Sequence, residues 1–205
     1  MITPAFIFTV FMLTLGPIKV APAFFAMTEG QTPEALRGLA LRGTLAATAV
    51  SLVIALAMAS LVASWRVSPD DLRIAGGILL FLASREIIGQ FNRPAGAPPA
   101  APPRHPAVTP LAIPTIVTPW GVAAILIFVE LANGDSKLLP TVIGILLLVM
   151  LLNLIGMLLA RRIIAVVDIV TFQVVGWIFA VLQAGFAVDA IITSLRNLAL
   201  FPPHV

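Results

Sequence analysis

The stretch "LTLGPIKVAPAFF", residues 13–25, interrupts the first long apolar run of the chain with a glycine, two prolines and a lysine. Proline lacks a backbone N–H and its ring clashes with the preceding helical turn, so Gly16-Pro17 predicts a break in the middle of a helix. The break frees backbone carbonyls near Thr14, which need partners from the protein or from water. Lys19 adds a charge at the same depth. These features predict that the freed backbone groups and the charge face one cavity.

The composition places the chain in a lipid bilayer. Of its 205 residues, 60% are hydrophobic and 10% are charged, whereas a soluble domain has about 25% charged residues. The chain has no cysteine, and its two histidines, His105 and His204, stand in proline-flanked stretches. We therefore expect no metal site and no cofactor. The basic residues are scattered between apolar runs, so we expect no nucleic-acid partner.

The apolar runs have the length of membrane-crossing helices, which is about 17–25 residues. They are too long for barrel strands and show no alternating pattern, so the sequence predicts an all-α polytopic membrane protein. The first run has no Lys or Arg before it and no evident cleavage site. We interpret it as a span and not as a removable signal peptide. The six expected spans are residues 4–27, 41–63, 72–90, 108–131, 138–160 and 170–194.

A proline- and alanine-rich segment, "NRPAGAPPAAPPRHP" at 92–106, reads as an extended linker. It divides the chain into a first three-helix repeat, 1–91, and a second one, 107–205. The arginines and lysines near the ends of the spans favour an orientation in a bacterial inner membrane with both termini in the periplasm. In that orientation the cytoplasmic set is Arg37, Arg42, Arg85, Arg93, Arg104, Arg161 and Arg162, and the outer set is Arg66, Arg73, Lys137 and Arg196.

The two halves share an order of features. Gly16-Pro17 in the first span has a counterpart in Thr118-Pro119 of the fourth, and Gly77 of the third span has one in Gly176 of the sixth. Because each half has three spans, the two halves would cross the membrane in opposite directions. This predicts an inverted repeat, in which paired proline-interrupted helices mark a substrate site at the bilayer midplane. The alternative is that both prolines merely kink their helices.

Four stretches carry a resemblance to a known family: "GPIKVAPAF" (16–24), "RGLALRGTLAA" (37–47), "RIAGGILLFL" (73–82) and "PLAIPTIVTPWGVAAIL" (110–126). They resemble the MarC family of integral membrane proteins, which is related to neutral amino-acid transporters and more distantly to LysE-type exporters. The resemblance implies the scaffold of this family and a role in transport or export.

The chain departs from the family pattern at both predicted breaks. The family usually has Asp-Pro-Ile-Gly-Asn in the first span, and this chain has the residues 16–20, "GPIKV", there. The family usually has Gly-Pro-Gly in the fourth span, and this chain has Thr118, Pro119 and Trp120. The substitutions therefore fall where the resemblance implies that substrate binds.

Polar residues within the spans are the candidate site residues. The position of Lys19 within a membrane span is enough to make it a candidate functional residue. The alternative is that its long aliphatic side chain lets the ammonium group reach the lipid headgroups. Asn153 and Gln183 would bond either a substrate or a neighbouring helix. The expected substrate-binding set is Gly16, Pro17, Lys19, Pro22, Thr118, Pro119, Gly121, Asn153 and Gln183.

Three classes of function are compatible with a chain of this kind. We expect a secondary transporter or exporter of small solutes, with neutral amino acids or related metabolites as substrates. The alternative is a channel-like or structural membrane protein that transports no amino acid. An enzyme would need a nucleophile with its base, paired carboxylates or a metal cluster, and the sequence offers none of these sets. The expected partners are the bilayer, a small-molecule substrate and further copies of the chain in a homo-oligomer.

Overall fold

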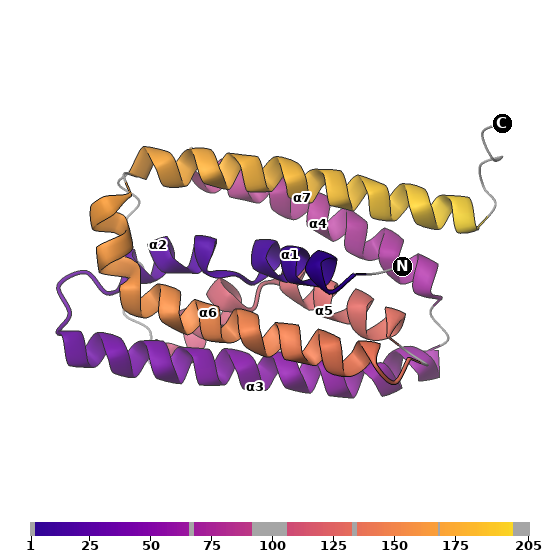
Figure 1. Cartoon of the computed structure of the whole chain (residues 1–205), viewed down its shortest axis with the longest axis horizontal. Coiled ribbons are helices and arrows are strands. Elements are labelled where there is room, and N and C mark those ends of the chain that lie inside the picture. The colour runs from indigo at the N-terminus through magenta and orange to yellow at the C-terminus, as the bar shows by residue number, and fades with distance from the viewer. Residues whose placement is uncertain (1–2, 66–67, 92–105, 133–134, 168, 199–205) are drawn as a thin grey trace.

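The computed structural model describes residues 3–65, 68–91, 106–132, 135–167 and 169–198. Within these ranges the chain is entirely helical (Figure 1), which confirms the all-α class. The linker 92–106 falls outside the described residues except for Pro106. The elements are α1 (Pro4–Thr14), α2 (Pro17–Met27), α3 (Pro33–Trp65), α4 (Pro69–Phe91), η1 (Ala107–Ile116), α5 (Pro119–Leu131), α6 (Leu138–Val166) and α7 (Ile169–Asn197).

Several of these helices are long and apolar enough to cross a membrane. Four segments qualify within the described residues: Pro4–Met27, Pro33–Ala57, Leu138–Val166 and Val174–Asn197. A fifth qualifies if η1 and α5, which meet at a bend of 61°, are taken as one span. The expected span 72–90 coincides with α4, which is not among them. The polytopic membrane class is supported, and the sixth span remains a prediction.

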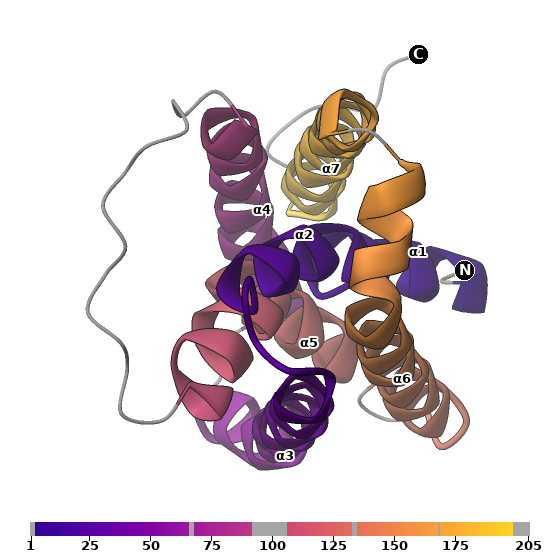
Figure 2. The ribbon, with the colours of Figure 1, turned by 90° about the vertical axis from the view of Figure 1, so that its left-hand side faces the viewer.

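The helices form three layers (Figures 1 and 2). The interrupted pairs α1–α2 and η1–α5 lie between the α4–α7 pair and the α3–α6 pair. Figure 1 shows α3 and α6 running in opposite directions, and α4 and α7 doing the same. Two sets of contacts between elements are paired across the halves: α2 packs on α6 as α5 packs on α3, and α1 packs on α6 as η1 packs on α3. A third set is not, because α4 packs extensively on α5 and α7 only slightly on α2.

Small residues allow the helices to approach closely, as is common where lipid replaces water as the solvent. A methyl group at Gly77 in α4 would lie 2.7 Å from a side-chain carbon of Ile191 in α7. One at Gly76 would lie 2.2 Å from Ile127 in α5. These two glycines therefore place α4 against both α5 and α7.

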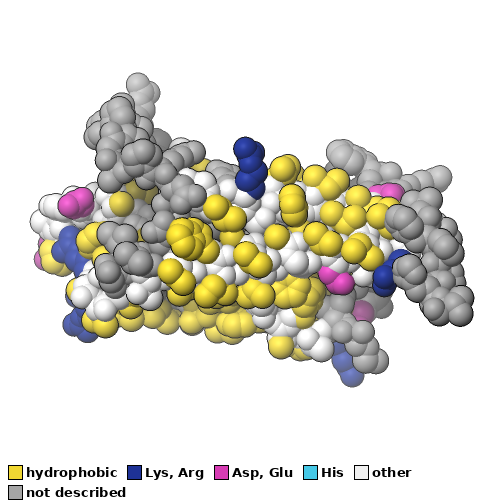
Figure 3. Space-filling view, turned by 90° about the horizontal axis from the view of Figure 1, so that it is seen from above, with side chains coloured by type: hydrophobic (Ala, Val, Ile, Leu, Met, Phe, Trp, Pro, Cys, Tyr) yellow, Lys and Arg dark blue, Asp and Glu magenta, His cyan; other side chains and the backbone are white. Residues whose placement is uncertain are grey.

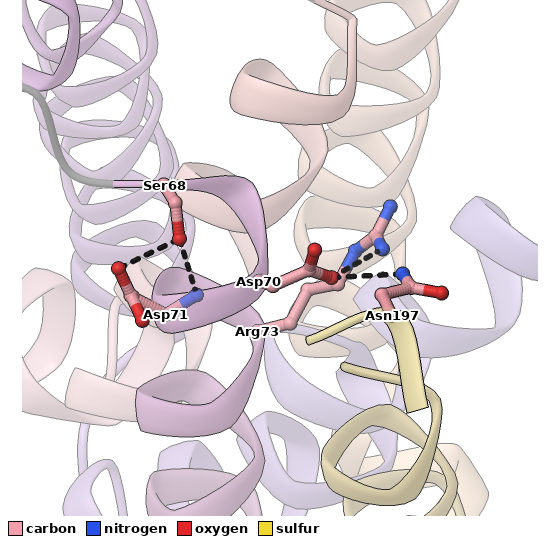
Figure 4. Close-up of polar contacts among 5 residues, drawn as sticks. All are labelled: Ser68, Asp70, Asp71, Arg73 and Asn197. Carbon is pink, nitrogen blue, oxygen red and sulfur yellow. Dashed lines mark hydrogen bonds and ion pairs between the residues drawn. The ribbon is translucent and has the colours of Figure 1, made fainter. Parts of the chain in front are cut away.

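Polar contacts fasten the beginning of α4 to the end of α7 (Figure 4). The hydroxyl of Ser68 accepts a hydrogen bond from the backbone N–H of Asp71 at 3.1 Å and donates to its carboxylate at 2.6 Å, which caps α4. The carboxylate of Asp70 accepts from the amide of Asn197 at 2.9 Å and pairs with Arg73 at 3.2 Å. These contacts hold α4 and α7 in register at this end of the molecule.

Apolar side chains fill the centre and also cover the outside. Phe11, Leu15 and Phe24 are fully buried in the core formed around the interrupted helices. On α7, Ile178 and Val181 are largely exposed, and hydrophobic side chains predominate along the middle of the face seen in Figure 3. An apolar exterior of this kind suits contact with lipid.

Candidate functional site

The first span is interrupted where the sequence predicts it. Helix α1 ends at Thr14 and α2 begins at Pro17, with extended backbone at Gly16. A methyl group at Gly16 would lie only 2.1 Å from the carbonyl oxygen of Met12. The tight approach of the backbone at Gly16 to the last turn of α1 therefore requires glycine at this position.

The fourth span is interrupted at Thr118-Pro119 and is irregular before that point. Its regular part, α5, begins at Pro119, and the hydroxyl of Thr118 caps it by accepting from the backbone N–H of Gly121 at 3.1 Å. Within η1 the backbone is extended at Thr109 and Ile113. Each of these residues precedes a proline, which disfavours helical backbone. The expectation of one helix from 108 to the break is therefore wrong.

The two breaks meet. The ammonium group of Lys19 donates to the backbone carbonyl of Thr14 and to the hydroxyl of Thr118, the latter at 3.2 Å. The Thr118 hydroxyl in turn donates to the Thr14 carbonyl at 3.2 Å. A hydroxyl has one donor and two acceptor positions, and Thr118 uses all three with Thr14, Lys19 and Gly121. The prediction that the breaks approach each other is confirmed, and Lys19, in the first turn of α2, lies at their junction.

Helix α6 packs against the first break. The buried amide of Asn153 donates to the carbonyl of Leu15 at 2.8 Å. One turn further on, a methyl group at Gly156 would lie 2.7 Å from the ring carbon Cβ of Pro17. Of the two interpretations of Asn153 from the sequence, a bond to substrate or to a neighbouring helix, the structure therefore shows the second. Its side-chain oxygen is buried with no hydrogen-bond partner among the described residues.

A cavity of about 590 Å³ opens beside the junction of the breaks. This volume lies within the range of small-molecule sites, about 300–1,000 Å³. The lining comes from α1, α2, η1 and α5, together with α4 and α7. Among the predicted site residues, the lining includes Lys19, Pro22, Thr118, Pro119 and Gln183. Gly16, Pro17, Gly121 and Asn153 are not part of it and instead shape or brace the breaks.

The lining is mostly apolar, with few polar groups. Gln183 is buried and its amide donates to the carbonyl of Leu80 in α4 at 3.0 Å. Lys19 is the charged residue of the lining, and no described carboxylate borders it. The first turn of α2 adds partial positive charge, because Gly16 provides no side-chain cap for its N–H groups. The cavity is therefore chemically suited to an anionic group on a small, partly apolar molecule.

Some lining residues were not in the predicted set. Thr14 contributes the carbonyl that binds Lys19, and its position just before the break is the signal that could have identified it. Gly176, noted in the sequence only as a repeat feature, borders the cavity from α7. Trp120 and Phe179 border the cavity with aromatic side chains. The departure from the family pattern at Trp120 could have identified the first of these, whereas the sequence around Phe179 contains no signal of this role.

The fold, its apolar exterior and its interrupted central helices define a polytopic α-helical integral membrane protein. The chain belongs to the MarC family, because the model of the MarC family integral membrane proteins matches residues 3–199. A UPF0056 membrane protein from Archaeoglobus fulgidus is 30% identical over 137 residues. That match covers 64% of this chain and 64% of the relative, so the chain spans less than two thirds of the relative's length. No solved structure matches the chain.

Proposed function

We propose that the protein is a secondary transporter or exporter of small solutes that carry a carboxylate, with neutral amino acids as the substrate class. Its substrate site is the cavity at the junction of the two breaks. The observation that carries this proposal is the position of Lys19, which contacts both breaks and borders the cavity.

The chemistry of the ammonium group supports an anionic ligand. An ammonium has three donors, and those of Lys19 that bind Thr14 and Thr118 account for two. The third is left for a ligand. A charged residue at the centre of a membrane helix costs about 2.5–3.5 kcal/mol on insertion scales, and a substrate carboxylate would offset part of this cost. The apolar walls would then contact the side chain of the amino acid.

The architecture of the proposed transporter is six spans in two inverted repeats. Helix α4 would be the sixth span, since 23 residues extend for about 34 Å and the hydrocarbon core is about 30 Å thick. Pro119 follows Pro17 by 102 positions, and the same offset separates the last residues of η1 and α1, Ile116 and Thr14.

Contacts and direction agree with this repeat. The paired contacts of α2 with α6 and of α5 with α3 are those that an exchange of the two halves would produce. In Figure 1, α5, α6 and α7 run against their counterparts α2, α3 and α4, and α1 begins at the end of the molecule where α7 ends. We place the termini in the periplasm of a bacterial inner membrane, following the loop charges. Rocking of one half against the other would expose the cavity to each side in turn.

Counterflow in liposomes tests the proposal. The purified protein is reconstituted into vesicles preloaded with unlabelled alanine, serine or glycine, and entry of the labelled compound is followed. We expect saturable, transient accumulation of at least one of them. Alaninol, which replaces the carboxylate of alanine with an alcohol, serves as the matched control and should not exchange. Flux that does not saturate, or equal exchange of alaninol, would contradict a carboxylate-binding transporter.

A further inference from the structure

A second hollow lies away from the proposed transport site, between the beginning of α3 and the end of α6. We call it the basic groove. Its volume is about 780 Å³, and it is lined by Arg37 and Leu41 from α3 and by Leu158, Leu159, Arg161 and Arg162 from α6. Both helix ends lie at the same end of the molecule, as Figure 1 shows. The groove shares no lining residue with the cavity beside Lys19.

Within the described residues, the three arginines of the basic groove have no acidic partner. No carboxylate belongs to the lining, and the ion pair recorded among the described residues, between Arg73 and Asp70, is at the opposite end of the molecule. The guanidinium of Arg161 is held in place by the carbonyls of Gln31 at 2.8 Å and Thr28 at 3.4 Å. Arg37 and Arg162 are exposed and have no recorded polar partner within the described chain.

The leucines of the basic groove lie deeper in the membrane than the arginines. Arg37 and Leu41 are four residues apart on α3, as are Leu158 and Arg162 on α6, so each pair shares one helix face. The exposed fractions are 50% for Leu41 and 44% for Leu158. The groove therefore has a cationic rim at the helix ends and an apolar floor along the spans.

This pattern matches one class of ligand. We propose that the basic groove binds an anionic phospholipid, with the headgroup phosphate among Arg37, Arg161 and Arg162 and an acyl chain along the leucines. Basic pockets between membrane helices bind anionic headgroups, and arginine binds phosphate through paired hydrogen bonds. The rule that basic residues gather on the cytoplasmic side explains why arginines occur at this end of the molecule. It does not explain why three of them line one groove together with leucines.

Arg42 provides an internal control for the proposal. It lies on α3 near Arg37, is exposed, and does not line the groove. Neutralising Arg42 therefore removes one positive charge at the same end of the molecule, as neutralising Arg37 alone does, without altering the site.

The test is lipid binding to the purified protein in detergent, measured by native mass spectrometry with phosphatidylglycerol and with phosphatidylcholine. We expect phosphatidylglycerol to bind more tightly. A basic residue near a membrane surface contributes roughly fivefold, so Arg37→Gln alone should reduce this preference by about fivefold, and its combination with Arg162→Gln by about 25-fold. Arg42→Gln, which removes one charge as Arg37→Gln does, should leave the preference unchanged. Leu158→Trp, which fills the floor without changing charge, should weaken phosphatidylglycerol binding.

Three results would overturn the proposal. The first is equal binding of the two lipids. The second is a loss in the Arg42→Gln protein equal to that in the Arg37→Gln protein, which would show a diffuse charge effect. The third is displacement of phosphatidylglycerol by soluble glycerol phosphate at similar concentration, which would show a site for a free anion and not for a lipid. None of these measurements depends on transport, so failure here leaves the proposed function untouched.

Discussion

Gly156→Ala tests whether α6 supports the first break as the structure describes. The added methyl group would lie 2.7 Å from Cβ of Pro17. Ordinary contacts begin at 3.4 Å, so about 0.7 Å of separation has to be gained. Because the contacted atom belongs to a proline ring at the start of α2, rotation of a side chain cannot relieve the clash. Overpacking of this kind costs about 1–3 kcal/mol.

Gly144→Ala on the same helix is the matched control. A methyl group at Gly144 meets nothing within 4 Å. Both substitutions gain the advantage of alanine over glycine within a helix, about 0.5–1 kcal/mol. This gain cancels when the two variants are compared, so the difference between them reports the clash alone.

Reversible unfolding in mixed micelles with increasing sodium dodecyl sulfate, followed by tryptophan fluorescence, measures this difference. We expect Gly144→Ala to be at least as stable as the parent. Gly156→Ala should have a free energy of unfolding about 1–3 kcal/mol below that of Gly144→Ala. Equal stability of the two variants would refute the close packing of α6 on the break.

Three further predictions concern the breaks and the orientation. Asn153→Leu removes the bond to Leu15 and should lower the free energy of unfolding by about 1 kcal/mol, measured in the same micelles; an unchanged value would mean that the bond is not formed. Thr118→Val should impair substrate counterflow far more than Thr118→Ser, which keeps the hydroxyl, and equal activity of the two would exclude a role for that hydroxyl. A reporter enzyme fused after Val205 should be active in the periplasm and one inserted within 92–106 in the cytoplasm, whereas the reverse pattern would invert the proposed orientation.

The breaks could be predicted from the sequence because proline acts locally. Pro17 and Pro119 each lack a backbone N–H and carry a ring that clashes with the preceding helical turn, and each is the first residue of a new helix. Pro22, in contrast, lies inside α2 without ending it. The same reasoning applied to Pro110 and Pro114 would have predicted the irregular backbone at Thr109 and Ile113, but a long apolar run was interpreted there as one helix. The positions of the prolines therefore predict the helix interruptions better than the length of the apolar runs does.

The partners of the site residues could not be predicted in the same way. That Lys19 bonds Thr118, 99 positions away, depends on the packing of two halves of the chain. Asn153 and Gln183 were both predicted as polar residues within spans, yet one braces the first break and the other bonds α4 beside the cavity. The role of each residue depends on which helix its side chain faces. The pattern of apolar residues in the sequence does not predict this.

The central claim is that Lys19 binds the carboxylate of the substrate. Counterflow with the Lys19→Met protein tests this claim most directly, and Lys137→Met, which changes the chain's other lysine in the turn before α6, is its matched control. Lys19→Met should abolish exchange at both limiting and saturating substrate while the protein remains folded, and Lys137→Met should exchange like the parent. Lys19→Arg should also be impaired, because the planar guanidinium is bulkier than the ammonium group and presents its donors in a different geometry. If Lys19→Met transports like the parent under both conditions, the proposed role of this lysine is wrong.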